Sequence, residues 1–293
     1  MNLTELFCNI DDFCNEFMVE WQKKLIESSE KKRNRNAQLS TSEIMTIVIL
    51  FHQKGFRNFK TFYKSYVREY LKNAFPKLVS YERFVVLMSS IMVPLCAYLQ
   101  SLRGKNTGIS FVDSTPIKVC HNMRIKRNKV FTGLAARGKS SMGWFFGFKL
   151  HLAVNDCGDI LNFCVTPGNI NDRAPVKKLV SKLTGKLFGD RGYISQQLFA
   201  ELFENGLQLV TTVRKNMKNK FMPLLDKLLL RKRFVIETIN DQLKNISQIE
   251  HSRHRSVGNF MVNLLAGLAA YIHQSKKPSI KNYDKTLPVN SAI

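Results

Sequence analysis

The stretch Phe146-Gly147-Phe148-Lys149-Leu150-His151-Leu152-Ala153-Val154 alternates apolar side chains with small or polar ones, which is the pattern of a half-buried β-strand. Asn155 to Asp159 supplies turn-forming residues, and the apolar run Ile160 to Val165 then returns as a hairpin partner. Upstream, Ile109 to Asp113 is a short apolar run that ends in a carboxylate. This part of the chain therefore predicts three antiparallel strands.

A succession of helical and strand patterns follows the hairpin. It predicts a helix capped near Asn171 and running to Leu183, a strand at Leu187 to Asp190, a helix from about Ser195 to Glu204, a strand at Leu207 to Val213, and helical regions at about Pro223 to Glu250 and Gly258 to Gln274. Strands separated by helices favour parallel pairing with right-handed crossovers. The predicted fold class is α/β, a ribonuclease H-like mixed five-stranded sheet flanked by helices.

The first 104 residues have helical patterns and form an all-α N-terminal domain in this prediction. Ser40 and Glu43 have the spacing of a capping box, and Ser80 can cap a later apolar run. From Phe51 to Tyr70, aromatic residues alternate with Lys and Arg. This alternation fits either a DNA-binding helical module or an aromatic core, and the sequence leaves both interpretations open.

The net charge points to a class of partner. The chain of 293 residues has 45 Lys and Arg against 22 Asp and Glu, a formal net charge of +23. A polyanion normally relieves such self-repulsion, and nucleic acid is the first candidate, although a basic ribosome-associated protein would have the same charge. Between Asp113 and Asp156 there is no acidic residue, while the basic ones include Arg124, Lys126, Arg127, Arg137, Lys139 and Lys149. We expect that segment to lie against DNA phosphates.

Cysteine spacing and apolar stretches indicate the compartment. The six cysteines contain no C-x-x-C pair, and the close histidines His251 and His254 have no matching cysteines, so we expect no zinc site and a reducing, cytoplasmic compartment. The N-terminus lacks the pattern of a signal peptide. Two uncharged stretches, Phe84 to Leu102 and Ser256 to Ser275, approach membrane-spanning length but contain polar residues, which favours buried core helices and no membrane.

Two expected strands each end in an acid. Asp113 follows Phe111 and Val112, and Asp190 follows an apolar run that begins at Leu187. If the two strands pair in parallel, both carboxylates emerge at one edge of the sheet, close enough to share a divalent cation. A single acid at a strand end is usually structural, but two neighbouring carboxylates repel each other unless a cation or a shared proton relieves them.

A third acid, Glu237, lies 47 positions after Asp190 (237 − 190) on an expected amphipathic helix. At 100° per residue, Glu237 and Lys244 lie along one border of the buried stripe, so the carboxylate could reach the rim of the sheet. Taken alone, Glu237 could equally be a surface glutamate paired with Arg233. Asp172 could be a further acid of the site or the cap of the helix that follows, and the cap is the favoured interpretation.

These residues resemble the DDE transposases of bacterial insertion sequences, nearest to the family numbered nine-eighty-two. The resemblance is strongest from about Ile109 to Arg255, and it rests on five ordered segments: Phe111 to Ile117, Gly143 to Leu152, Thr166 to Asp172, Gly189 to Tyr193, and the helix with Glu237 and Lys244. It implies that Asp113, Asp190 and Glu237 are the catalytic residues and bind Mg²⁺ or Mn²⁺, with two ions expected. It also implies that Lys244 contacts DNA.

The resemblance implies an enzyme that binds the ends of its own element, hydrolyses phosphodiester bonds and joins the freed 3′ hydroxyls to target DNA. Lys149 and Arg191 would join Lys244 in gripping phosphate, and pairing of two DNA ends implies a homodimer on DNA. The expected segments are a DNA-binding domain at 1–104, a catalytic domain at 105–275 and a disordered tail at 276–293. A non-catalytic DNA-binding protein and a plain nuclease of the same fold are the alternatives.

One competing motif is present. Gly133 to Ser140 satisfies the phosphate-loop pattern G-x-x-x-x-G-K-S, which would cradle a nucleotide. Such a loop must follow a buried strand and open a helix, whereas here a basic segment precedes it and a strand pattern follows. We therefore interpret Arg137 and Lys139 as contacts to the DNA backbone.

Overall fold

The computed structural model describes residues 2–27, 38–212, 222–250 and 254–280. The chain divides into two compact units: unit 1 comprises 1–102 and 242–275, and unit 2 comprises 103–241 and 276–293. The first boundary lies close to residue 104, where the sequence pattern changes. Segment 242–275, expected in the catalytic domain, instead belongs to the compact unit of the N-terminal helices. The functional division into domains stays a prediction.

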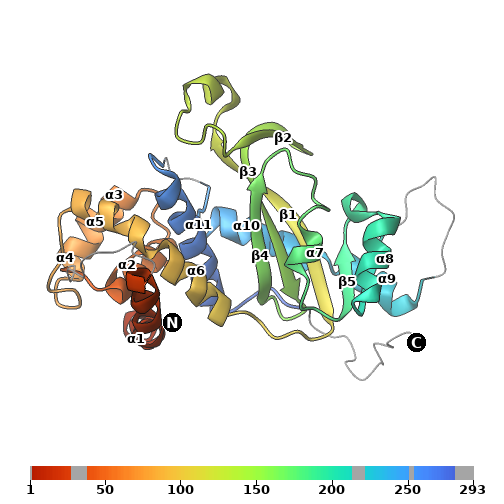
Figure 1. Ribbon diagram of the computed structural model, residues 1–293, viewed down its shortest axis with the longest axis horizontal. Coiled ribbons are helices and arrows are strands. Elements are labelled where there is room, and N and C mark those ends of the chain that lie inside the picture. Colours follow the sequence, from red (N-terminus) through yellow and green to blue (C-terminus); the bar gives the residue numbers. More distant parts are fainter. Residues whose placement is uncertain (1, 28–37, 213–221, 251–253, 281–293) are drawn as a thin grey trace. The chain divides into compact units, whose positions relative to one another are not determined.

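Unit 2 is built on one mixed sheet (Figure 1). Its strands are β1 (Ile109–Cys120), β2 (Ala136–Ser140), β3 (Gly143–Asn155), β4 (Ile160–Pro167), β5 (Gly185–Gly189) and β6 (Leu207–Thr211). The strand order is β2-β3-β1-β5-β6, and β4 also pairs with β3. Strand β3 is antiparallel to β1, β2 and β4, whereas β1, β5 and β6 are parallel. The expected α/β class, with its mixed sheet and its helical N-terminal region, is confirmed.

The sheet has a sixth strand that the sequence pattern did not predict. Strand β2 pairs with residues 143–147 of β3, and β4 pairs with residues 148–154, so the two follow each other along one edge of β3. A Cβ atom at Gly138 or Gly147 would collide with the main-chain carbonyl of Gly168 or Ile117. Glycine therefore permits the close approach of strands here, and the segment 133–140 is a β-hairpin arm instead of a phosphate loop.

Helices cover both faces of the sheet. The helical elements of unit 2 are η3 (Asn122–Arg127), α7 (Val176–Leu179), η4 (Arg191–Tyr193), α8 (Gln196–Glu204), α9 (Leu224–Arg231) and most of α10 (Phe234–Asn245). Figure 1 shows α7 in front of the strands and α10 behind them. A buried cluster that includes Val112, Leu187 and Leu202 fills the α7 and α8 side. The alternation of β1 then places Asp113 on the opposite face, with Phe111.

Two expected helices differ from the structure. The helix expected from Asn171 to Leu183 is reduced to α7, because residues 171–175 form turns and Pro175 precedes the first helical residue. The region expected to be helical from Pro223 to Glu250 consists of two helices, α9 and α10, separated at Lys232 and Arg233. Strand β6 ends at Thr211, and Val213, the expected end, lies outside the described residues.

Unit 1 is helical. Its elements are α1 (Leu3–Glu27), α2 (Thr41–Gln53), α3 (Phe59–Thr61), the π-helical η1 (Phe62–Val67), α4 (Arg68–Tyr70), α5 (Tyr81–Met88), η2 (Ser89–Ile91), α6 (Met92–Ser101) and α11 (Val257–Ile272). Ser40 and Glu43 form the expected capping box, and Ser80 caps α5. Helix α11 packs against α2 and α6, because its residues from Val262 to Tyr271 are buried. These contacts explain why 242–275 groups with the N-terminal helices.

The aromatic segment of unit 1 contributes mainly to its core. Phe51, Phe62 and Tyr63 are fully buried and pack against one another and against Phe84. Tyr70, by contrast, is 75% exposed. The core interpretation therefore accounts for the buried members of this segment, and a DNA-binding role for unit 1 stays a prediction.

One helical stretch among the described residues, Tyr81–Ser101, is long and apolar enough to cross a membrane by length and composition alone. Phe84, Leu95 and Leu99 in this stretch are buried within unit 1. A core helix passes the same test, so this observation is weak evidence for a membrane span.

Residues 276–280, expected to belong to a disordered tail, contact unit 2. Lys277 forms an ion pair with Asp159 at 2.8 Å, and the N–H of Ile280 donates to the carbonyl of Asp156. These contacts order the first residues after α11. The remainder of the expected tail, 281–293, lies outside the described residues.

Acid is expected to destabilise unit 1 through two buried histidines. Burial lowers the pKa of His52 to about 4, and burial together with His52 lowers the pKa of His254 to about 4. Because these values lie below the unfolded value of 6.5, the stabilisation is complete above pH 6.5 and is lost as the pH falls towards 4. The loss for His52 alone amounts to at most about 3 kcal/mol.

The check is chemical unfolding of the protein and of His52→Gln between pH 7 and pH 4.5. The variant should show a shallower decline in the free energy of unfolding, because it removes one titrating group. An identical decline in both proteins would show that His52 does not carry the effect.

Candidate active site

Asp113 lies in β1 with its carboxylate only 20% exposed. It accepts a hydrogen bond from Nδ2 of Asn240 on α10 at 3.0 Å, and Nη1 of Arg233 lies 3.8 Å from its Oδ1. Burial raises the pKa of Asp113 to about 6, against the lowering effect of Arg233 and the backbone N–H of Ser114. The charges of Asp190 and Glu237 raise it further. The three acids therefore interact electrostatically at one place.

The parallel register of β1 and β5 brings Asp190 level with Asp113. Phe111 of β1 pairs with Phe188 of β5 in parallel, so Asp113 and Asp190 each lie two residues beyond a paired position. Asp190 is half-buried and caps the short helix η4, where its Oδ1 accepts the N–H of Gly192 at 2.8 Å. Local chain geometry thus holds the second carboxylate in place.

Gly192 is expected to be required for the position of the Asp190 carboxylate. A Cβ atom at residue 192 would lie 2.9 Å from Oδ1 of Asp190, closer than real Cβ contacts allow. Gly192→Ala should therefore displace the carboxylate and lower the DNA cleavage that the resemblance implies about 10- to 100-fold, as small misplacements of a reacting group do. Cleavage rates on element-end DNA check this prediction.

A matched control is Gly258→Ala, because a Cβ atom there meets only Ser89 at 3.4 Å, an ordinary contact. Equal cleavage rates for Gly192→Ala and the unchanged protein would refute the positional role.

Glu237 lies in the first turn of α10, with its side chain 53% exposed. It forms an ion pair with Arg233, four residues earlier on the same helix. The pairing expected of a surface glutamate is therefore present. The same guanidinium also lies beside Asp113. Arg233 therefore forms ion pairs with both Asp113 and Glu237.

The donor chemistry of this site suits a hard divalent ion. Carboxylate oxygens are the ligands that Mg²⁺ and Mn²⁺ prefer, and the raised pKa of Asp113 reflects buried negative charge that a cation would relieve. Among the described residues, no group of three His, Cys, Asp or Glu side chains is gathered tightly enough to hold a metal ion. Arg233 supplies the counter-charge in this arrangement.

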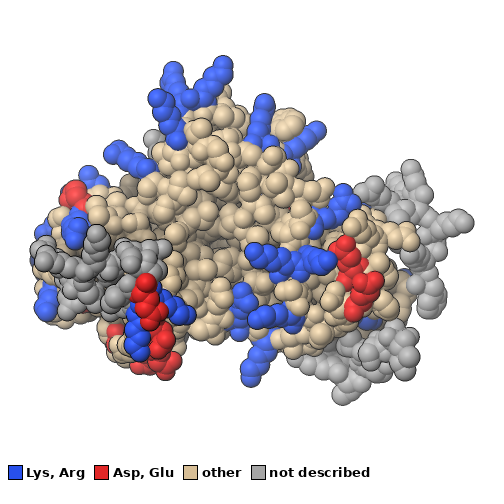
Figure 2. Space-filling view, viewed as in Figure 1, with Lys and Arg blue, Asp and Glu red and all other residues tan. Residues whose placement is uncertain are grey.

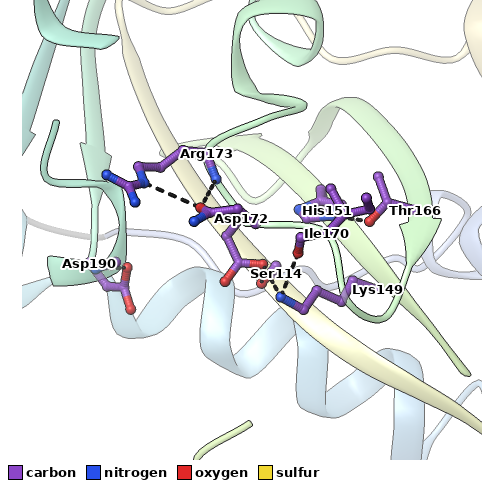
Figure 3. A network of polar contacts seen from close by, with 10 residues as sticks. Ser114, Lys149, His151, Thr166, Ile170, Asp172, Arg173 and Asp190 are labelled. Atoms are coloured by element: carbon purple, nitrogen blue, oxygen red, sulfur yellow. Dashed lines mark hydrogen bonds and ion pairs between the residues drawn. The ribbon is translucent and has the colours of Figure 1, made fainter. Parts of the chain in front are cut away.

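A second polar network lies on the other face of the sheet (Figure 3). Oδ1 of Asp172 accepts from the hydroxyl of Ser114 at 2.8 Å and from Nζ of Lys149 at 2.9 Å, and Lys149 also donates to the carbonyl of Ile170. The cap interpretation of Asp172 is wrong: α7 begins only at Val176, and its N-cap makes no side-chain hydrogen bond.

Lys149, expected to grip DNA phosphate, has a side chain that is only 13% exposed and donates within this network. Its predicted contact with DNA stays untested. Beside it, Nε2 of His151 contacts Oγ1 of Thr166 at 2.8 Å. Burial lowers the pKa of His151 to about 4, so the imidazole is neutral at pH 7.

The other predicted DNA contacts fall in several places. Arg124, Lys126 and Arg127 on η3, and Arg137 and Lys139 on β2, are all exposed. Figure 2 shows Lys and Arg side chains gathered over this part of unit 2. The ring of Trp144, 53% exposed, lies 4.9 Å from the guanidinium of Arg137 and 5.8 Å from Nζ of Lys139, so cation–π contacts position both cations.

Two further predicted contacts lie outside this basic segment. Arg191 is exposed, immediately after Asp190. Lys244 lies in the last turn of α10 and forms an ion pair with Glu250 at 3.6 Å within unit 1.

Sequence reasoning missed three side chains near the carboxylates: Arg233 as a partner of Asp113, Asn240, and Tyr193. The helical spacing of Arg233, Glu237 and Asn240 was a usable signal, because i, i+3 and i, i+4 neighbours share a helix face. Tyr193 ends one of the five segments that carry the resemblance, Gly189 to Tyr193, but that segment gave the tyrosine no role.

Residues 103–257, just over half of the chain, match the family described as the transposase DDE domain. The chain belongs to this family of DDE transposases. Its fold also matches the cryo-EM structure of the piggyBac transposase synaptic complex with hairpin DNA, at a TM-score of 0.51 and 11% identity over 92% of this chain and 74% of that one. At this identity the likeness shows the fold alone. A search of curated proteins finds no match.

Proposed function

We propose that this DDE transposase acts on the ends of a bacterial insertion element, nearest to the nine-eighty-two family. It would hydrolyse phosphodiester bonds at those ends and transfer the freed 3′ hydroxyls to target DNA. The observation that supports the proposal is that Asp190 and Glu237, both far from Asp113 in the sequence, lie near enough to raise the pKa of its carboxyl.

Asp113, Asp190 and Glu237 would hold Mg²⁺ or Mn²⁺, with two ions expected. Two such ions about 3.5 to 4 Å apart can activate the attacking oxygen and stabilise the leaving one. The residues of the chain prepare this site: Asn240 orients Asp113, Gly192 fixes Asp190, and Arg233 balances the charge of Asp113 and Glu237. With cations held by these acids, Arg233 would be available to contact a phosphate.

DNA would lie along the basic segment between β1 and β3. We call its five predicted DNA contacts the hairpin surface: Arg124, Lys126, Arg127, Arg137 and Lys139. All five side chains are exposed, and no acidic residue lies between Asp113 and Asp156 to oppose them. Arg191 would contact the phosphate nearest Asp190, and Lys244 would contact DNA farther along α10. Because the ammonium of Lys149 is paired with Asp172, its main effect would be to support β1 beside Asp113. The homodimer on DNA remains an expectation from the reaction.

The test is an in vitro reaction with linear element ends, a supercoiled plasmid and Mg²⁺. The proposal expects cleaved ends and joined products, both lost in EDTA. Cleavage without joining would indicate a nuclease of the same fold, and DNA binding with neither product would indicate a non-catalytic DNA-binding protein.

A further inference from the structure

The aromatic ring of Tyr193 lies in the hydrophobic core of unit 2. Tyr193 is 2% exposed and belongs to the buried cluster on the α7 and α8 side of the sheet. A Cβ atom at Gly189 would lie 3.0 Å from its ring and 3.3 Å from Val112, so glycine at 189 makes room for the tyrosine. The ring therefore has a fixed position, and so does its hydroxyl.

The hydroxyl of Tyr193 makes no hydrogen bond among the described residues. The hydroxyl of Ser114 lies near enough to lower the pKa of Tyr193, but the two hydroxyls do not meet with hydrogen-bond geometry. Buried polar groups are almost always paired, so an unpaired one marks a partner that is supplied from elsewhere.

The surroundings of this hydroxyl are acidic. Asp113, Asp172 and Asp190 each raise the pKa of Tyr193, after the larger effect of burial. These acids come from β1, the segment before α7 and the end of β5. Figure 3 shows the side chain of Asp190 to the left of Asp172, which lies beside Ser114 and Lys149. A protonated donor thus lies near Asp113 and Asp190, two of the three acids of the proposed function.

We propose that the Tyr193 hydroxyl donates a hydrogen bond to an oxygen atom that arrives when the carboxylate site is loaded. That oxygen belongs either to water held by a divalent ion or to a phosphate of bound DNA. Both are hydrogen-bond acceptors, and either could pair with the unpaired hydroxyl of Tyr193. A fixed donor of this kind stabilises developing negative charge because it needs no rearrangement. The inference rests on the proposed function.

Tyr193→Phe tests the inference, because it removes only the hydroxyl. Three quantities are measured: thermal unfolding in EDTA, Mn²⁺ affinity by calorimetry without DNA, and cleavage of element-end DNA. In EDTA the variant should unfold at the same or a higher temperature, since no hydrogen bond is lost. Cleavage should fall about 100- to 1,000-fold, the range for loss of one preorganised donor.

The Mn²⁺ measurement distinguishes the two sources of the oxygen. A lower Mn²⁺ affinity in the variant assigns the hydrogen bond to ion-bound water, whereas an unchanged affinity with slower cleavage assigns it to DNA phosphate. A lower unfolding temperature with unchanged cleavage and Mn²⁺ affinity would overturn the inference, because the hydroxyl would then have a structural partner. Unchanged values of all three would overturn it as well.

Tyr63→Phe is the matched control. Tyr63 is also fully buried, but its hydroxyl donates to the carbonyl of Val79 at 2.8 Å. Its loss should lower the unfolding temperature and leave Mn²⁺ affinity unchanged. If the unchanged protein itself neither binds Mn²⁺ nor cleaves DNA, the proposed function fails and the inference fails with it. If the unchanged protein does both and Tyr193→Phe matches it, only the inference fails.

Discussion

Replacing Asp113 by Asn is expected to lower cleavage and strand transfer by about 10³-fold or more, equivalent to about 4 kcal/mol of transition-state stabilisation. The carboxylate is buried, interacts with Asp190 and Glu237, and is the acid around which the proposed site is arranged. Asn keeps the shape and can keep the contact with Asn240 but cannot supply a negative oxygen. DNA affinity should remain within about two-fold, because the exposed cations are untouched.

The same variant is expected to be more stable than the unchanged protein in EDTA at pH 8. The pKa of Asp113 rises from 3.8 to about 6 on folding, so its ionisation opposes the fold, and stability is lost as the pH rises through that range. Asn removes this cost, which is at most about 3 kcal/mol. Well below pH 3.8 the carboxyl is protonated in both states and the gain should vanish.

Asp159→Asn is the control for this experiment. Asp159 lies in the turn between β3 and β4, pairs with Lys277, and is not among the charges that shift the pKa of Asp113. It should keep full cleavage activity. Cleavage by Asp113→Asn at the rate of the unchanged protein would remove Asp113 from the reaction.

Neutralising three cations of the hairpin surface is expected to lower DNA affinity about 10²- to 10³-fold at 0.1 M salt. Each phosphate contact releases about 0.9 of a counterion, so the triple variant Arg124→Gln, Lys126→Gln and Arg127→Gln should reduce the slope of log K against log salt by about 3. These side chains are exposed on η3, so the fold should lose little stability. Binding isotherms at several salt concentrations check both numbers.

A control with the same change in net charge separates local contacts from general attraction. Lys177, Lys178 and Lys182 are exposed near α7, away from the hairpin surface in the sequence. Changing these three to Gln should reduce affinity much less. An equal loss in both triple variants would mean that overall charge, and no particular surface, governs binding.

The strand pattern predicted much of unit 2 because apolar alternation is a local signal. Asp190 directly follows β5 as expected, whereas the expected strand end at Asp113 is wrong, because β1 continues to Cys120. The pairing of Phe111 with Phe188 follows from two short apolar runs, and it places Asp113 and Asp190 in register. Strand β2 escaped prediction because its sequence, Ala136-Arg137-Gly138-Lys139-Ser140, has no apolar alternation and pairs only because glycines allow close approach. Pro175 and the turn before it shortened α7.

The partners of the acids depended on three-dimensional packing, which no local pattern contains. Arg233 looked like a helix-surface partner of Glu237, yet the packing of α10 on the sheet also brings it to Asp113. Asp172 looked like a cap, but β3 presents Lys149 to it. Tyr193 had no role assigned from the sequence, and the packing of the fold leaves its hydroxyl unpaired near three acids.

The most direct measurement is the anomalous scattering of Mn²⁺ in crystals of the protein soaked with that ion. The account predicts a peak bound by carboxylate oxygens of Asp113 and Asp190, with Glu237 at the same ion or a second one and Arg233 displaced from Asp113. The site would be refuted by crystals in which Mn²⁺ binds elsewhere, or nowhere, while Arg233 stays between Asp113 and Glu237 at saturating ion concentration.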